Sequence, residues 1–392
     1  MREAPCSSVG SGSAGRLTTT VSRPTEELDR VYELPFTGRP HPNYGGEQIP
    51  ALQIVETSIP ILRGCAGGCR FCSLTLHQGK RVTSRSEASV IKQIERLTDD
   101  PDFKGTISDL GGPTANMYRM HCMDEEARKS CRRPSCLFPS VCKNLDINHS
   151  PVIALMRAAR DVEGVKRVLI ASGVRMDLAI RNGNYIRELV GHHVGGLLKV
   201  APEHTDPDVL AAMGKPPVET FERFQRAFEQ FACDAGLKRH VIPYFIAGHP
   251  GCDLGAMVRL AEYLKRHDLR PEKVQDFIPL PMTWSAAMYY SSVDPADGRP
   301  VHVARGDRER RLQRALLQWF VPSNWRDVRD ALLEAGREDL IGPGPKCLIP
   351  ANEPAGARKR HGAKKRKGGK PQGKSGGYRP GRSGAKRRRR RE

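Results

Sequence analysis

The sequence RGCAGGCRFC, at residues 63–72, is the most informative stretch for the fold of this chain. Its cysteines, Cys65, Cys69 and Cys72, are separated by three residues and then by two. Three thiolates can hold a four-iron cubane and leave its fourth iron open to a small molecule, whereas structural zinc usually takes four ligands. The spacing therefore predicts a reactive 4Fe-4S site, with zinc as the less favoured alternative.

The residues around the cysteines predict a tight loop at the end of a strand. Glycines at positions 64, 67 and 68 allow close approaches that larger residues forbid. Residues 54–62 are largely apolar and β-branched, which predicts a buried strand just upstream. Because α/β barrels keep their active sites at the carboxyl ends of strands, we expect the cysteine loop to lie at such an end.

The cysteine spacing, with the aromatic Phe71 before the last cysteine, resembles the signature of the radical S-adenosylmethionine (SAM) superfamily. The similarity covers about residues 30–350 and is closest to the YgiQ-like members. Members of that family carry a sizeable domain before this region, so we expect a chain that is shortened at its N-terminus. Four phrases carry the finer resemblance: PNYG at 42–45, SDLGGPTANMY at 108–118, VAPEHT at 200–205 and IGPGP at 341–345.

Apolar periodicity along the chain predicts an α/β fold in which strands and helices alternate. The resemblance implies that these units form a partial (β/α)6 TIM-like barrel. Ser150 is expected to cap its helix, with Pro151 in the first turn. Helices are expected at 86–97, 150–162, 185–190, 220–233 and 254–267, and strands at 105–110, 165–171, 196–200, 240–247 and 274–280.

Composition divides the chain into expected regions. We expect a partly disordered N-terminal segment over 1–50, a radical SAM core over 51–305, a helical extension over 306–350 and a disordered basic tail over 351–392. Residues 358–392 contain seventeen Lys or Arg and one acidic residue, in a chain of net charge +20. Such a tail is expected to bind a polyanion such as RNA or DNA through salt-sensitive contacts, and a solvated tail without function is the alternative.

The resemblance also implies which residues bind SAM. Gly111 and Gly112 follow the second strand, where family members present backbone to the methionyl amino group. Ser172 and Arg175 follow the third strand, and Arg175 is the expected partner of the SAM carboxylate because a guanidinium offers paired donors. Phe71 completes this cofactor set. The alternatives are an ordinary glycine turn and a solvated surface arginine.

Further polar residues are expected at later strand ends. Lys199, Glu203 and His204 gather at the end of the fourth strand, where they could contact SAM or substrate. The alternative is a structural pair between Glu203 and Lys199. The phrase GHPG at 248–251, which contains His249, resembles a loop that lies under adenine in related barrels.

Four more cysteines, Cys122, Cys131, Cys136 and Cys142, lie in one segment after the glycine pair. Four thiolates could hold zinc or a second iron-sulfur cluster. Their gaps of eight, four and five residues match no standard motif, so free or redox-active thiols are the alternative.

The chain shows no run of eighteen apolar residues and no signal-peptide pattern, so we expect no membrane span and reduced thiols in the cytoplasm. We predict a radical SAM enzyme with a 4Fe-4S cluster and SAM as cofactors and an unknown substrate. The resemblance implies a flavodoxin- or ferredoxin-type electron donor and reductive cleavage of SAM to a 5'-deoxyadenosyl radical. The alternative is a noncatalytic, zinc-stabilised protein that associates with nucleic acid.

Overall fold

The computed structural model describes residues 24–357, which belong to one compact unit. The expectations for residues 1–23 and for the basic tail from residue 358 lie outside the described residues. Strands and helices alternate through the unit, as the apolar periodicity predicts, so the fold is α/β. No helix within the described range is long and apolar enough to cross a membrane.

The first strands form a parallel framework. β1 (Ser58–Pro60) pairs with β5 (Asp109–Gly111), and β4 (Thr106–Ile107) pairs with β6 (Arg167–Val168). β4 and β5 follow one another along the chain, so this stretch joins β1 on one side to β6 on the other. The amide of Leu110 continues the ladder by donating to the carbonyl of Leu169.

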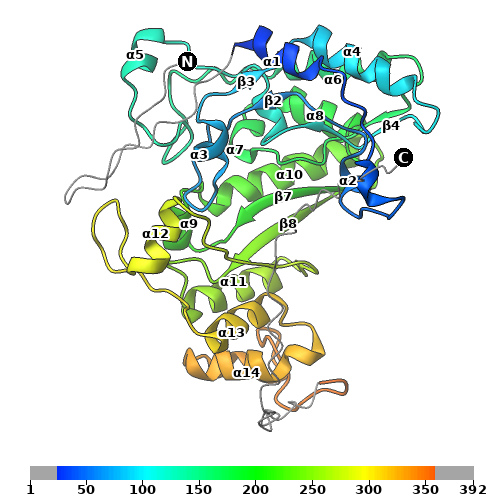
Figure 1. Cartoon of the computed structure of the whole chain (residues 1–392). Helices are drawn as coiled ribbons and strands as arrows, with labels where there is room; N and C mark the ends of the chain where they lie inside the picture. The colour runs from blue at the N-terminus through cyan, green and yellow to red at the C-terminus, as the bar shows by residue number, and fades with distance from the viewer. Residues whose placement is uncertain (1–23, 358–392) are drawn as a thin grey trace, which may run out of the picture. The chain divides into compact units, whose positions relative to one another are not determined.

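The later strands form a second parallel sheet in the order β7, β8, β9. These strands span Leu197–Glu203, His240–Ala247 and Gln275–Asp276. Figure 1 shows β7 and β8 as long neighbouring arrows with α10 (Val218–Asp234) beside them. The strands of the described residues do not close into a barrel.

The five predicted helices are all confirmed, and the short one expected at 185–190 extends over ten residues. Their amphipathic patterns bury one apolar face of each helix. Besides α10 they are α4 (Glu87–Thr98), α6 (Ser150–Asp161), α8 (Gly183–His192) and α11 (Leu254–Arg266).

Further helices occupy the loops and the C-terminal part of the unit. α13 and α14 lie in the region where a helical extension is expected, and they share a buried cluster with α11. These helices are α1 (Thr25–Tyr32), α2 (Leu52–Val55), α3 (Leu74–Gln78), α5 (Glu125–Ser130), α7 (Met176–Ala179), α9 (Pro207–Met213), α12 (Trp284–Ser291), α13 (Asp307–Leu317) and α14 (Trp325–Glu334).

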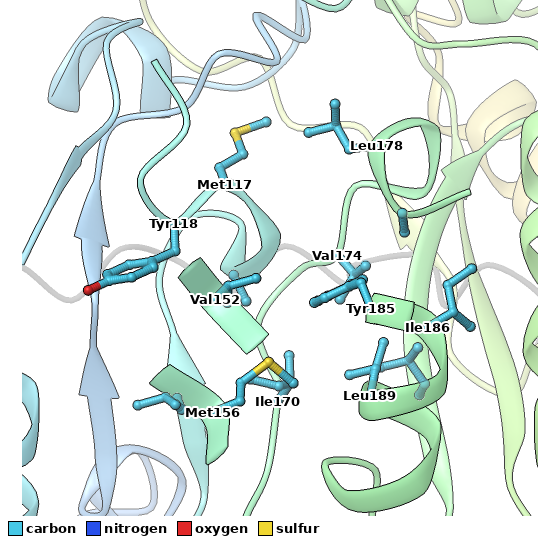
Figure 2. Packing of buried hydrophobic residues seen from close by; sticks show 14 of the residues in the cluster. Met117, Tyr118, Val152, Met156, Ile170, Val174, Leu178, Tyr185, Ile186 and Leu189 are labelled. Atoms are coloured by element: carbon cyan, nitrogen blue, oxygen red, sulfur yellow. The ribbon is translucent and has the colours of Figure 1, made fainter. Parts of the chain in front are cut away.

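The main core lies where α6 and α8 pack onto the first strands. Figure 2 shows Val152 and Met156 of α6 near Ile170, which follows β6, and Tyr185 and Leu189 of α8 on the neighbouring side. All five side chains are buried. Burial of each large apolar side chain stabilises the folded chain by about 1.5–3 kcal/mol, so this core fixes the strand ends that carry the polar site.

The expected strand at 54–62 is wrong in its extent. Residues Leu52–Val55 form α2 instead, and Ile54 is 73% exposed. β1 ends at Pro60, and the amide of Ile61 makes its last bond to β5, to the carbonyl of Gly111 at 2.7 Å. The chain then turns into β2 (Leu62–Arg63), which pairs antiparallel with β3 (Thr83–Ser84).

Three smaller expectations also need correction. The strand expected at 274–280 is reduced to β9, because Pro279 and Pro281 interrupt the sequence that follows. The strand expected at 165–171 is limited to β6. The N-cap of α6 is His149 rather than Ser150, although Pro151 does lie in the first turn.

Candidate metal centre

The cysteine loop runs from β2 to α3 and is held by backbone contacts. Gly64 has φ of 86°, and a Cβ at this position would lie 2.0 Å from the carbonyl oxygen of Arg81, so only glycine is compatible with this path. The amide of Cys65 donates to the carbonyl of Gly79 at 3.1 Å. These contacts fix the start of the loop, at the first of the three thiols.

The three thiols of the loop are half-buried and affect one another electrostatically. Burial raises the pKa of Cys65, and it raises the pKa of Cys72 to about 11. The amide of Gly67 lies 3.4 Å from Sγ of Cys65, and the amide of Leu74 donates to the sulfur of Cys72. Buried thiols with amide donors on their sulfurs suit a metal cluster, because metal coordination deprotonates a thiol that burial would keep neutral.

Residues that follow three of the parallel strands contact the cysteine loop. Thr114, after β5, has its Oγ1 4.0 Å from Sγ of Cys65. Arg175, after β6, has its Nη1 3.4 Å from Sγ of Cys69. The ring of Phe71 lies 6.0 Å from that of His249, which follows β8. The loop thus lies at the carboxyl ends of the strands, where α/β barrels carry their active sites.

Gly111, Gly112 and Ser172, expected to bind SAM, lie together. The amide of Gly112 donates to Oγ of Ser172 at 3.4 Å. A Cβ at Gly111 would lie 1.9 Å from that Oγ and 2.8 Å from the Asp109 carboxylate. Close packing therefore requires glycine at 111 whether or not a ligand binds, and the contacts of this group with SAM stay a prediction.

Arg175 is buried and already has partners. Its Nε and Nη2 donate to the two carboxylate oxygens of Asp177 at 3.0 and 2.6 Å. Burial lowers the pKa of Arg175, but the Asp177 charge more than offsets this and the pKa lies above its ordinary value, so the guanidinium is charged. Its assignment to the SAM carboxylate stays a prediction, and the alternative of a solvated surface arginine is wrong.

The sequence analysis assigned no role to Asp177, although this residue stands two positions after Arg175, which was expected to bind SAM. It also missed Asn116, whose Oδ1 accepts from the amide of Arg175 at 2.8 Å and whose Nδ2 donates to the Arg175 carbonyl at 3.0 Å. Asn116 is part of the phrase at 108–118, which was used as evidence of family resemblance and not to predict a contact with Arg175.

Glu203 is buried at the end of β7 with a strained backbone. Its φ of 72° is unusual for a residue with a side chain, and such strain costs on the order of 1–3 kcal/mol. Burial raises the pKa of its carboxyl group, and the nearby charges of Lys215 and Arg175 oppose that shift. Its partner is Lys215, with Nζ 3.8 Å from Oε1, so the suggested pairing with Lys199 is wrong because Lys199 is exposed.

Three buried histidines near the strand ends are held neutral. Burial lowers the pKa of His149 and of His204 to about 4 and that of His249 to about 3. His204 Nδ1 accepts from the amide of Asp206 at 3.0 Å, and His249 Nε2 lies 2.7 Å from Oγ of Ser285. These contacts make both side chains part of the packing beneath the cysteine loop.

Stability is expected to fall as the pH decreases below about 6.5, the unperturbed pKa of histidine. The three imidazoles have folded-state pKa values below that, so the unfolded chain binds more protons and stability is lost toward the folded-state values. These three groups contribute about 4 kcal/mol per pH unit to the slope near pH 5, and His193, whose pKa burial also lowers to about 4, adds to it. Guanidinium unfolding at several pH values measures this slope. A His149→Gln variant should bind about one proton fewer on unfolding, which lowers the slope by about 1.4 kcal/mol per pH unit. An unchanged slope would contradict the assignment of a low pKa to His149.

The second cysteine group braces the first loop. The amide of Cys136 donates to the carbonyl of Ala66 at 2.9 Å, and Ser135 Oγ donates to the carbonyl of Gly67 at 2.6 Å. Cys131 lies 3.6 Å from Nζ of Lys80, and the Cys122 thiol donates to the Asp124 carbonyl at 3.3 Å. Between residues 24 and 357 no three or more His, Cys, Asp or Glu side chains form a group that could hold a metal ion, and this holds for Cys65, Cys69 and Cys72 as well as for the second group. A closed site formed with Cys142 stays a prediction.

Family models match most of the chain. The model described as the radical SAM superfamily matches residues 59–264, and the model described as radical SAM N-terminal matches residues 17–58. Residues 272–391 match a domain of unknown function, DUF3362.

Curated relatives are similar along most of this chain. A UPF0313 protein of Rhodopseudomonas palustris is 50% identical over 348 residues, which cover 87% of this chain and 51% of the relative. A UPF0313 protein of Vibrio parahaemolyticus is 49% identical over 353 residues, which cover 86% of this chain and 45% of the relative. The chain thus spans about half the length of these relatives.

Solved structures show more distant similarity. The radical SAM methyltransferase TsrM of Kitasatospora setae, with tryptophan substrate and a SAM analog bound, matches with a TM-score of 0.37 and 15% identity over 56% of this chain and 35% of its own. The cobalamin-dependent SAM radical enzyme OxsB, with aqua-cobalamin and SAM bound, matches with a TM-score of 0.45 and 13% identity over 72% of this chain and 45% of its own.

Proposed function

Because the chain belongs to the radical SAM superfamily, as a YgiQ-like member related to the UPF0313 proteins, we propose that it is an enzyme that cleaves SAM reductively. Cys65, Cys69 and Cys72 would hold a 4Fe-4S cluster. When bound, that cluster supplies the electron that breaks SAM into methionine and a 5'-deoxyadenosyl radical, which takes a hydrogen atom from substrate. A flavodoxin- or ferredoxin-type protein would deliver the electron.

The observation that carries this proposal is the environment of the three thiols. They lie on one short loop, amides donate to the sulfurs of Cys65 and Cys72, and the charged guanidinium of Arg175 lies at the sulfur of Cys69. Three thiolates gather negative charge, and hydrogen bonds to sulfur together with a nearby cation offset that charge. The loop offers three cysteines, which is the ligand number that leaves one iron of a cubane open.

The residues around the loop would place SAM at the strand ends. Gly111, Gly112 and Ser172 form a close-packed surface near Thr114, and Phe71 with His249 forms an aromatic contact on another side. We infer that SAM binds between these groups, with backbone amides and the Ser172 hydroxyl as donors. The packed strand ends would limit water around the reacting centre.

The proposal extends to the arrangement of the strands. We infer a partial (β/α)6 barrel, supported by the parallel pairings of β1 with β5, β4 with β6, and β7 with β8 and β9. A helix lies between each later strand and the next, from β6 to β9, as in βαβ units.

Three further parts of the proposal concern the location of the protein, a polyanion as its partner and a second metal site. A cytoplasmic location suits thiolates that must stay reduced to hold a cluster. The basic sequence at 358–392 would attract a polyanion, RNA or DNA, through salt-sensitive contacts. The segment with Cys122, Cys131, Cys136 and Cys142 would hold a second cluster or zinc.

Product formation by the chain itself tests the proposed function. The anaerobically purified chain, reconstituted with iron and sulfide, is expected to form 5'-deoxyadenosine from SAM when dithionite is added, because each reductive cleavage followed by hydrogen transfer releases one molecule of it. Chromatography measures the product, and elemental analysis measures iron and zinc. A chain that retains zinc, binds no iron and forms no product would support the noncatalytic alternative instead.

A further inference from the structure

A buried ion pair lies directly against the proposed cluster ligands. The side chains of Arg175 and Asp177 are only 9% and 8% exposed, and two guanidinium nitrogens face the two carboxylate oxygens. The third nitrogen, Nη1, is free of Asp177 and lies 3.4 Å from Sγ of Cys69. The pair thus presents one N–H donor and one fixed positive charge to a cluster thiolate.

The position of this guanidinium is fixed by its backbone. The fully buried side chain of Asn116, in the 3-10 turn η2 (Ala115–Met117), bonds to both the amide and the carbonyl of Arg175. Nδ2 of Asn116 also lies 3.4 Å from Nε2 of His149. Hydrogen bonds therefore hold both the main chain and the side chain of Arg175 in place beside Cys69.

Stability alone does not explain this arrangement. A buried ion pair is often no more stable than apolar residues of the same shape, because both charges lose their hydration. A pair with a purely structural role also has no need to aim a third nitrogen at a thiol. The potentials of iron-sulfur clusters, in contrast, depend on net charge and on hydrogen bonds to the sulfurs, which are the two features that this pair supplies.

We propose that Arg175 and Asp177 are positioning residues that set the reduction potential of the cluster held by Cys65, Cys69 and Cys72; this inference rests on the function proposed above. An added electron makes a thiolate-bound cluster more negative, so the Arg175 charge favours the reduced state. The Asp177 carboxylate opposes that effect while holding Arg175 in place. Glu203 and Lys215 are two further charged groups near this end of the site, and their charges offset each other in part.

Opposite changes in potential are therefore expected from two single substitutions. Arg175→Met removes the positive charge and the N–H···S contact, so the ratio of reduced to oxidised cluster at the wild-type midpoint should fall about tenfold, which is a shift of about 59 mV for a one-electron couple. Asp177→Asn keeps the shape of the side chain and leaves the Arg175 charge unopposed, so the midpoint should rise. The reduced-cluster signal in electron paramagnetic resonance, followed through a redox titration without SAM, measures both.

Arg181 supplies a matched control. It stands in the same segment and is exposed, and its Nε donates to the backbone carbonyl of Asp177. Arg181→Met removes the same charge, yet the fraction reduced should change by less than about twofold because solvent and salt screen an exposed charge. A change as large as that of Arg175→Met would point to the overall charge of the protein and overturn the proposal.

The two variants separate this inference from the proposed function. Absence of a reducible cluster in the wild-type chain would overturn the proposed function, and the inference would fall with it. A normal wild-type cluster with Asp177→Asn unchanged, or lowered in potential, would overturn the inference alone. If Arg175→Met does not fold, the direction of the midpoint shift in Asp177→Asn tests the inference instead. Arg175→Lys should keep a midpoint potential closer to that of the wild type, because it retains the positive charge.

Discussion

Alanine at Cys65, Cys69 and Cys72 together is expected to remove the reducible cluster and to lower 5'-deoxyadenosine formation to the level of a protein-free control. All three thiols lie on one loop, and amides donate to the sulfurs of two of them, so the triple substitution leaves that loop without a sulfur ligand. Iron and sulfide content, the visible absorption of the cluster and product formation after dithionite would be measured on the reconstituted protein.

The second cysteine group provides the matched control. Alanine at Cys131, Cys136 and Cys142 removes the same number of thiols from a segment that contacts the first loop through backbone and serine atoms. This variant should retain the SAM-cleaving cluster, and any fall in its iron content would measure a second site. If it lost product formation as fully as the first variant, the assignment of the reactive cluster to Cys65, Cys69 and Cys72 would be untenable.

Gly111→Ala is expected to destabilise the folded chain by about 3 kcal/mol, at the upper end of the usual cost of overpacking. The new methyl group would meet Oγ of Ser172 at 1.9 Å and the Asp109 carboxylate at 2.8 Å. Asp109 cannot easily move, because its Oδ1 accepts from the amides of Ala171 and Ser172. Denaturant unfolding of the variant and the wild type measures the change in free energy.

A glycine in the adjoining loop gives the control for this overlap. A Cβ at Gly173 would meet only the carbonyl oxygen of Pro113, at 3.6 Å, so Gly173→Ala should change stability by less than about 1 kcal/mol. Adding Ser172→Gly to Gly111→Ala should recover part of the loss, because the closest contact disappears. Equal effects of the two alanine substitutions, or no recovery in the double variant, would contradict the packing explanation.

The elements that could be predicted from the sequence are those with a strong local pattern. The amphipathic helices α4, α10 and α11 and the strand β8 follow the expected ranges closely, because their apolar periodicity lies within one segment. The strand expected at 54–62 was too long because apolar content does not show which apolar residues stay exposed, and Ile54 and Val55 lie exposed in α2. Composition alone therefore overstated the length of that strand.

The candidate site was predictable as a set of residues but not as a set of contacts. Gly111 and Ser172 were both singled out, yet their close contact with each other was not foreseen. Arg175 was expected to face a ligand, and its partners are Asp177 and Cys69. Glu203 was considered as a partner of Lys199 because the two are near in sequence, whereas the folded chain pairs it with Lys215.

The sequence by itself determined the chemistry that this protein can carry: three thiols at a fixed spacing on a glycine-rich loop, within an alternation of helices and strands. Only the tertiary structure decided which distant residues complete the site. Arg175 reaches Cys69 across 106 positions because the parallel pairing of β4 with β6 brings the end of the third predicted strand to the cysteine loop. Local sequence patterns indicate burial and spacing. The contact between Arg175 and Cys69 depends instead on strand order, which is a property of the whole folded chain.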